Sequence, residues 1–174
     1  MNCILLSYNS ILERPFHSGF TSFLLNLLDF SMTNYLLNQH KLIDEKDIGP
    51  VIFRLYDNRI YHVIVKKGEK ATMDIVREGY LFLDSHGGGQ FYNIYEFESF
   101  SDVDPDVREW SASPTNNSYT LIDAIVFSSF PQKIIADFYI AINRPVKPTK
   151  SFKSLESAYK WVMEMIEKDP GADQ

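Results

Sequence analysis

Over most of its length this chain alternates blocks of apolar residues with short polar stretches, and the spacing inside each block predicts its secondary structure. Val51 to Tyr56 and Ile60 to Val65 are rich in β-branched and aromatic residues, which favour strands. Asp57-Asn58 lies between them, and these residue types tolerate left-handed turn conformations. The pattern therefore predicts a β-hairpin. His62 falls on one face of the second strand, and we interpret it as a half-buried residue rather than a metal ligand.

The next block has helical spacing and is followed by glycines. Apolar residues recur at helical intervals over 75–83, and Thr72 can cap the start of such a helix. Gly87, Gly88 and Gly89 come directly afterwards, and glycine commonly ends helices because it adopts positive φ without strain. Residues 91–97 are then predicted to form a buried strand.

His86 and the three glycines after it also suggest two kinds of catalytic or binding loop. The oxyanion-hole loop of lipase-like hydrolases follows a strand and works with a Gly-x-Ser-x-Gly motif, which the sequence lacks. A phosphate-binding loop has a strand before it and a helix after it, and here that order is reversed. We therefore interpret the glycines as the stop of a helix and His86 as a solvent-side cap residue.

The second half of the chain begins with a polar stretch and a very apolar strand. Pro105 is suited to the first turn of a short helix, with Asp104 as its cap. Residues 121–128 are predicted to form a strand that is buried on both faces, as expected of a central parallel strand. Asp123 lies near the start of this strand, and we interpret it as a cap or as a hydrogen-bonding residue at the strand edge.

Two more helices are predicted towards the C-terminus. Pro131 suits the first turn of one, and Asp137 is expected on its solvent side. Phe152 is predicted to reach the core from a short strand, and Ser154 to cap the last helix. The helix that begins near Pro131 is predicted to face the core with Ile134, Ile135, Phe138, Tyr139 and Ile142.

The resulting element order is β-β-α-β-α-β-α-β-α. Helices between apolar strands indicate an α/β fold with a mostly parallel sheet, and the initial hairpin adds an antiparallel edge. We expect residues 48–168 to form this domain, residues 1–47 to be an N-terminal extension and residues 169–174 to be a flexible tail. The apolar segment within residues 1–31 is interpreted as an amphipathic helix that docks on the domain, or as sequence preceding an alternative start at Met32.

Charge and composition exclude several classes of function. The net charge is −6 and the sequence pI is about 5.2, which argues against nucleic-acid binding and against anionic membranes. Cys3 is the single cysteine, so disulfide frameworks and cysteine-based metal sites are excluded, and a reducing cytoplasm is the expected compartment. We identify no catalytic residues, no metal ligands and no cofactor-binding pattern, and an unrecognised enzyme is the third of three hypotheses.

A family resemblance covers residues 48–168 and is strongest over 121–162. The strand that ends in Ser128, the helix with Asp137-Phe138-Tyr139 and the turn Asn143-Arg144-Pro145 lead to a last helix with Trp161. This run resembles the C-terminal half of SpoIIAA-like bacterial proteins of the STAS superfamily. The resemblance implies a STAS/SpoIIAA-like α/β domain for regulated protein interaction, without enzymatic activity.

In anti-sigma factor antagonists of this superfamily, a Ser or Thr after the third strand is phosphorylated. Phosphorylation there would add charge and alter partner docking. The matching stretch here contains Ser99 and Ser101, of which Ser101 is the better match by position, although the Asp-Ser-x-Gly motif is absent. The resemblance therefore implies a switch position at Ser101 or Ser99.

The same stretch supplies a candidate partner surface. Phe100, Arg108 and Trp110 are residue types that favour binding hot spots, so we expect a protein partner or self-association there. The alternative placement has both aromatic side chains packed under the polar loop. A second hypothesis is a small-molecule or lipid carrier, because the superfamily resembles lipid-binding folds of the Sec14 type and the many aromatic residues could line a pocket.

Overall fold

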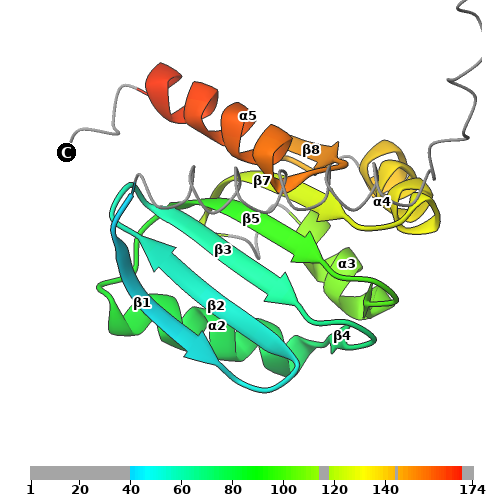
Figure 1. Cartoon of the computed structure of the whole chain (residues 1–174), viewed down its shortest axis with the longest axis horizontal. Coiled ribbons are helices and arrows are strands. Elements are labelled where there is room, and N and C mark those ends of the chain that lie inside the picture. The colour runs from blue at the N-terminus through cyan, green and yellow to red at the C-terminus, as the bar shows by residue number, and fades with distance from the viewer. Residues whose placement is uncertain (1–39, 114–117, 144, 170–174) are drawn as a thin grey trace, which may run out of the picture.

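The computed structural model of this chain describes residues 40–113, 118–143 and 145–169 (Figure 1). Eight strands and four helices follow one another in this described part. In order they are β1 (Leu42–Asp47), β2 (Val51–Tyr56), β3 (Ile60–Val65), β4 (Lys70–Ala71), α2 (Met73–Ser85), β5 (Phe91–Phe97), β6 (Asp102–Val103), α3 (Pro105–Ala112), β7 (Thr120–Phe127), α4 (Phe130–Asn143), β8 (Thr149–Phe152) and α5 (Leu155–Lys168).

A six-stranded mixed sheet forms the centre of the molecule. Its strand order is β1-β2-β3-β5-β7-β8. The pairs β1–β2 and β2–β3 are antiparallel, whereas β3, β5, β7 and β8 run parallel to one another. The predicted α/β class, with a mostly parallel sheet and an initial antiparallel hairpin, is confirmed. The hairpin turns at Arg59, which has a φ of 64°.

Helices cover the two faces of the sheet unequally. Helix α5 lies over one face and packs Leu155, Ala158, Tyr159 and Val162 against the strands β5, β7 and β8. Helices α2 and α3 lie over the opposite face, where α2 contributes Phe82 and Leu83 to a second apolar cluster (Figure 1). The alternation of side chains along the strands places successive residues in different clusters. The sheet is therefore buried on both sides at its centre.

Helix α2 begins and ends as its sequence predicts. The side chain of Thr72 accepts a hydrogen bond from the Ile75 backbone N–H, which satisfies a donor in the first turn. His86 is the C-cap residue, and the glycines after it all have positive φ, at 90°, 64° and 108°. The His86 ring is held between the Phe82 carbonyl oxygen and Asp44. The glycine stretch is thus a helix stop, and its histidine links α2 to β1.

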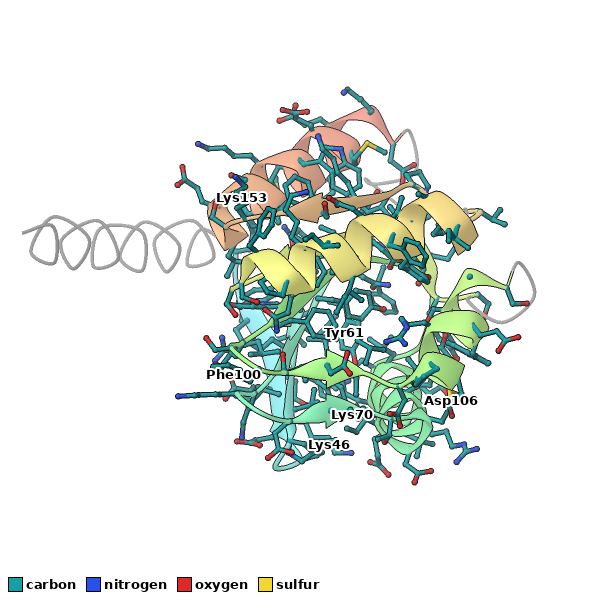
Figure 2. All side chains as sticks on the ribbon, turned by 90° about the vertical axis from the view of Figure 1, so that its right-hand side faces the viewer. Lys46, Tyr61, Lys70, Phe100, Asp106 and Lys153 are labelled. Carbon is teal, nitrogen blue, oxygen red and sulfur yellow. The ribbon has the colours of Figure 1, made fainter. Side chains whose placement is uncertain are left out.

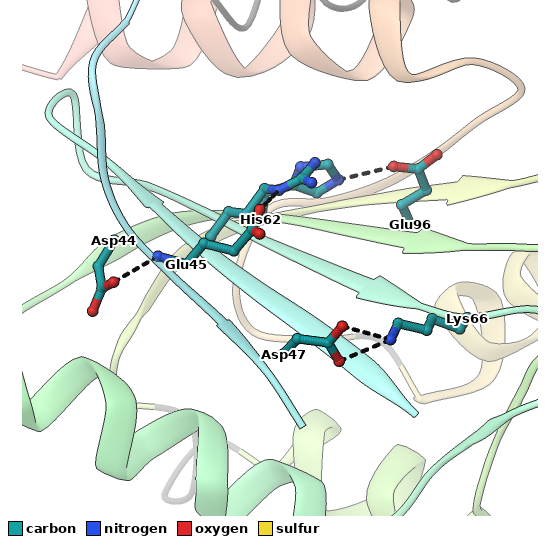
Figure 3. Close-up of polar contacts among 7 residues, drawn as sticks. Asp44, Glu45, Asp47, His62, Lys66 and Glu96 are labelled. Atoms are coloured by element: carbon teal, nitrogen blue, oxygen red, sulfur yellow. Dashed lines mark hydrogen bonds and ion pairs between the residues drawn. The ribbon is translucent and has the colours of Figure 1, made fainter. Parts of the chain in front are cut away.

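The sheet begins before residue 48, the predicted start of the domain. Strand β1 is a charged edge strand, and two ion pairs link it to the hairpin: Glu45 to Arg54 on β2 at 2.6 Å and Asp47 to Lys66, directly after β3, at 2.8 Å (Figure 3). Most of its side chains are exposed, and its sequence lacks the alternation of apolar and polar residues that marks a half-buried strand. A charged edge of this kind also discourages pairing with a further strand. Residues 1–31 and Met32 lie outside the described residues.

Helix α4 corrects one prediction. The expected core face is largely exposed: Ile134, Ile135, Phe138 and Ile142 have exposed fractions of 50–65%, and Ala136 is the buried residue of this helix. Tyr139 is half-buried. The helix turns a narrow side towards the sheet, so the apolar stripe on its outer side has no neighbour among the described residues. Asp137 is exposed as predicted, and pairs with Lys133.

Candidate aromatic cavity with a buried carboxylate

The crossover helices do not fill the space above their face of the sheet. A cavity of about 240 Å³ remains between β2, β3, β5 and β7 on one side and α2, α3 and α4 on the other. Figure 2 looks at this side of the molecule, where Tyr61 lies between α4 and the short strand β6. Eight aromatic side chains line the cavity, namely Phe53, Tyr61, Tyr80, Tyr95, Phe97, Trp110, Phe127 and Tyr139.

The inner wall depends on a close approach between a glycine and a tyrosine. A Cβ atom at position 79 would lie 2.7 Å from the Tyr61 hydroxyl oxygen. Only glycine at this position therefore leaves enough room for the hydroxyl. The Tyr61 ring packs against Phe53 and Phe82, with ring centroids 5.9 and 6.3 Å away. The hydroxyl itself is buried and has no hydrogen-bond partner among the described residues. Such a group is costly to bury without a partner.

A buried carboxylate lies in the wall of this mostly apolar cavity. Asp123 is the fourth residue of β7, and its side chain faces the cavity because its neighbours Ile122 and Ala124 face α5. The Asn93 amide donates to the carboxylate oxygen Oδ1 of Asp123 at 3.1 Å and to the Thr120 hydroxyl at 2.8 Å. The sequence interpretation as a cap or strand-edge residue missed this placement, because it requires the positions of three helices.

Burial raises the pKa of the Asp123 carboxyl to about 6, against its ordinary value of 3.8. The hydrogen bond from Asn93 and the positive charge of Lys147 oppose this rise but do not cancel it. Burial raises the pKa of Tyr80, Tyr95 and Tyr139, and the negative charge of the Asp123 carboxylate raises it further. Their rings therefore lie within electrostatic reach of Asp123.

The outer part of the cavity contains a positively charged side chain, Arg108, whose charge is offset by a nearby carboxylate. The Arg108 guanidinium donates to the Val103 carbonyl oxygen and lies 3.7 Å from the Asp102 carboxylate. Trp110, from the same helix, packs on Tyr80 with ring centroids 5.5 Å apart. Of the predicted partner surface, Arg108 and Trp110 thus line the cavity, while Phe100 is 83% exposed.

The predicted switch residues lie beside the N-terminus of α4. The Ser101 side chain is buried, and its hydroxyl donates to the Glu98 carbonyl oxygen at 2.7 Å, whereas Ser99 is half-buried. The Gln132 side chain donates to the carbonyl oxygens of Glu98 and Ser101, both at 3.0 Å. This bridge fixes α4 to the loop after β5. A phosphoryl group on Ser101 would have to displace the hydroxyl from its contact with Glu98.

A second polar pair lies on the opposite face of the sheet. The His62 ring is fully buried rather than half-buried, and its Nε2 lies 3.0 Å from the Glu96 carboxylate on the neighbouring strand β5 (Figure 3). The parallel register places Glu96 beside Ile64 and so brings the two side chains within reach of each other. No group of three or more metal-binding side chains occurs within the described ranges.

The fold and the cavity define an α/β domain with an aromatic site that contains a buried carboxylate. One family model matches residues 53–166 and is described as a domain of unknown function (DUF7793). The chain belongs to this family, since the match covers more than half of its length. Neither a curated protein nor a solved structure matches the sequence. In the part of the chain that the structure describes, no helix is long and apolar enough to cross a membrane.

Proposed function

We propose that this domain binds a small organic ligand in the aromatic cavity. The observation that carries the proposal is the cavity itself, about 240 Å³ bounded by aromatic and aliphatic side chains and by the Asp123 carboxylate. Small-molecule sites are commonly concave pockets lined mainly by hydrophobic and aromatic side chains, with a few polar groups that orient the ligand. The lining of this cavity fits that description.

The size of the cavity limits the size of the ligand. An apolar cavity of roughly 150 Å³ accommodates benzene, and sites for drug-sized ligands begin at roughly 300 Å³. A volume of about 240 Å³ therefore suits a ligand with one or two rings, or an alkyl chain of similar bulk. The expected carrier role of the Sec14 type is compatible with such a ligand only if its apolar part is short.

The two tryptophans of the chain allow a direct test. Trp110 lines the cavity, whereas Trp161 packs against Phe152 in the opposite layer with ring centroids 5.5 Å apart. In the variant Trp161→Phe, fluorescence reports Trp110 alone. Titration with toluene and with phenethyl alcohol is expected to give a saturable change in that signal. The variant Trp110→Phe, which retains Trp161, is the control and is expected to show none.

A filling substitution tests whether the response comes from the cavity. Ala136 is buried on α4 and lines the cavity, while Ala141 is exposed on the same helix. Leucine at position 136 would occupy part of the volume, so Ala136→Leu is expected to weaken probe binding at least tenfold. Ala141→Leu adds the same atoms outside the cavity and should leave binding unchanged. Absence of a saturable response for every probe, or equal binding by both variants, would contradict the proposal.

A second candidate function is the protein contact expected from the STAS resemblance, here as self-association. It is favoured by the exposed stripe of α4, in which Phe130, Ile134, Phe138 and Ile142 recur every four residues. Residues at this spacing lie on one side of a helix, and an antiparallel second copy would present the same stripe in return. Exposed apolar surface of this kind commonly marks an interaction site.

Sedimentation velocity of the full chain tests the second candidate. We expect wild type to sediment as a dimer at concentrations at which Phe138→Ser sediments as a monomer. Glu164→Ser on α5 is a matched control, because Glu164 is exposed on the layer opposite α4. A monomeric wild type, or a dimer that survives Phe138→Ser together with Ile134→Ser, would contradict self-association through this stripe.

A further inference from the structure

The charged residues that line the cavity have a net negative charge, and this charge favours one class of ligand. Three residues with formal charge line it: Asp102, Arg108 and Asp123. Arg108 and Asp102 lie 3.7 Å apart at the outer part, so their charges offset each other. Lys147 acts on Asp123 from the side of Pro145 and Val146, away from the aromatic cavity. An ionised Asp123 therefore leaves the cavity with a negative charge.

The aromatic side chains around this carboxylate suit a positive charge. The electron-rich face of a tyrosine or tryptophan ring attracts a cation within about 6 Å of its centroid. Tyr80, Tyr95 and Tyr139 come from three different elements and lie close enough to Asp123 for its charge to affect their phenols. A group that touches the carboxylate would thus also meet aromatic rings on several sides.

The buried Tyr61 hydroxyl supplies an independent observation. The Tyr61 side chain is 5% exposed and lines the cavity, and its buried hydroxyl has no hydrogen-bond partner among the described residues. This hydroxyl can donate a hydrogen bond to a ligand or accept one from it. A buried polar group without a protein partner calls for an explanation, because such groups are rare in folded proteins.

We propose that the cavity recognises a small organic cation, an amine with an aromatic or short aliphatic body, with its nitrogen at Asp123 and its body among the aromatic side chains. This inference rests on the proposed ligand-binding function and names its substrate class. The ammonium group would form a charge-assisted hydrogen bond with the carboxylate, which is stronger than a bond between neutral groups. The water-poor surroundings strengthen that attraction further.

Three probes of nearly equal shape test the proposal: phenethylamine, phenethyl alcohol and phenylacetate. They differ in carrying a positive charge, no charge or a negative charge at neutral pH. By calorimetry with the full chain at pH 7.5, we expect the amine to bind at least tenfold more tightly than the alcohol, and phenylacetate to bind weakest. The variant Asp123→Asn keeps the size of the side chain and is expected to lose the preference for the amine while still binding the alcohol.

A pH profile gives a readout that a structural role of Asp123 would not produce. Phenethylamine keeps its proton over the range studied, so only the protein changes charge. Its affinity for wild type should fall about tenfold for each pH unit below about 6, because the cation then competes with a proton at Asp123. Alcohol binding, and amine binding by Asp123→Asn, should remain flat. Should Asp123→Asn not fold, the wild-type profile alone decides.

The outcomes separate this inference from the proposed function. Equal binding of amine and alcohol to wild type, with loss of both in Ala136→Leu, would overturn the cation preference and leave ligand binding standing. A saturable response to none of the three probes would overturn both. Tighter binding of phenylacetate than of phenethylamine would show that Arg108 rather than Asp123 selects the ligand, and would also overturn the cation proposal.

Discussion

The Tyr61 hydroxyl occupies the space that a side chain at position 79 would fill, at 2.7 Å from the position of its Cβ atom. The two residues lie on β3 and α2, so this approach sets how closely the helix packs on the sheet. Glycine in the middle of a helix costs about 1 kcal/mol relative to alanine. Glycine is nevertheless required at this position, because the Tyr61 hydroxyl lies directly against α2.

Position 79 should therefore be coupled to position 61. In wild type, Gly79→Ala is expected to destabilise the fold, because the packed Tyr61 ring has to shift. In a Tyr61→Phe background the obstructing oxygen is gone, and Gly79→Ala should instead stabilise the fold by up to about 1 kcal/mol. A double-mutant cycle by urea denaturation measures this coupling, expected at about 1–3 kcal/mol. Additive effects would show that the two residues do not constrain each other.

The raised pKa of Asp123 should make folding less favourable as the pH rises. Well below pH 3.8 the carboxyl is protonated in both folded and unfolded chains, and the burial penalty is absent. As the pH rises from 3.8 to about 6, the unfolded chain loses this proton first, so stability falls. The full effect corresponds to about 3 kcal/mol.

Replacing Asp123 with Asn should remove this dependence. We expect Asp123→Asn to be more stable than wild type by up to about 3 kcal/mol at pH 7, and we expect this advantage to disappear well below pH 3.8. Chemical denaturation at several pH values measures the difference. The polar groups around this carboxylate, Asn93, Thr120, Tyr80, Tyr95, Tyr139 and Lys147, remain in both proteins. A difference that is independent of pH would show that Asp123 does not titrate in this range.

The two sides of the molecule should respond differently to the loss of a phenylalanine ring. Phe152 is 8% exposed within the α5 layer, whereas Phe138 is 65% exposed on α4. Truncation of a buried ring costs about 3–5 kcal/mol, while substitutions at exposed positions usually change stability by less than about 0.5 kcal/mol. At concentrations at which the chain is monomeric, thermal denaturation is thus expected to show a large loss for Phe152→Ala and almost none for Phe138→Ala. A comparable loss for both would indicate that the outer side of α4 is covered.

The contact between His62 and Glu96 should also contribute to stability. His62 is fully buried, and its Nδ1 atom has no partner among the described residues, so Glu96 is the partner of its other nitrogen. Glu96→Ala would leave both nitrogens without one and is expected to cost about 1–3 kcal/mol. Glu96→Gln retains a hydrogen-bonding group and should cost clearly less. Equal losses would indicate that the ring does not depend on a polar partner.

Local rules in the sequence predicted most of the elements but not the cavity. The hairpin, Thr72 and the glycines after α2 carry signals that span a few residues, and those predictions are confirmed. Strand β1 was missed because it is charged and mostly exposed. The apolar residues of α4 have the same spacing whether they face the core or solvent, so their exposure depended on tertiary contacts.

The candidate site has no compact sequence signature. Its residues come from nine elements, and aromatic side chains that line a cavity follow the same two- and four-residue spacing as those that fill a core. Asp123 was noticed as a polar residue in an apolar strand. An aspartate among alternating apolar residues is the one local signal that could have indicated the site, because a charge at such a position requires a compensating environment.

The sheet also determines which parts of the molecule can separate. After β3 the strand order advances without reversal through β5, β7 and β8, and α2, α3 and α4, which connect these strands, lie on one face. None of these helices can move away from the sheet without displacing the strands that precede and follow it in the chain. Helix α5 follows the last strand of the described chain and connects no further strand to the sheet. Each helix of the layer with the cavity is thus connected to a strand of the sheet at both of its ends. Helix α5 is connected at one end, so its separation from the sheet would leave every strand paired.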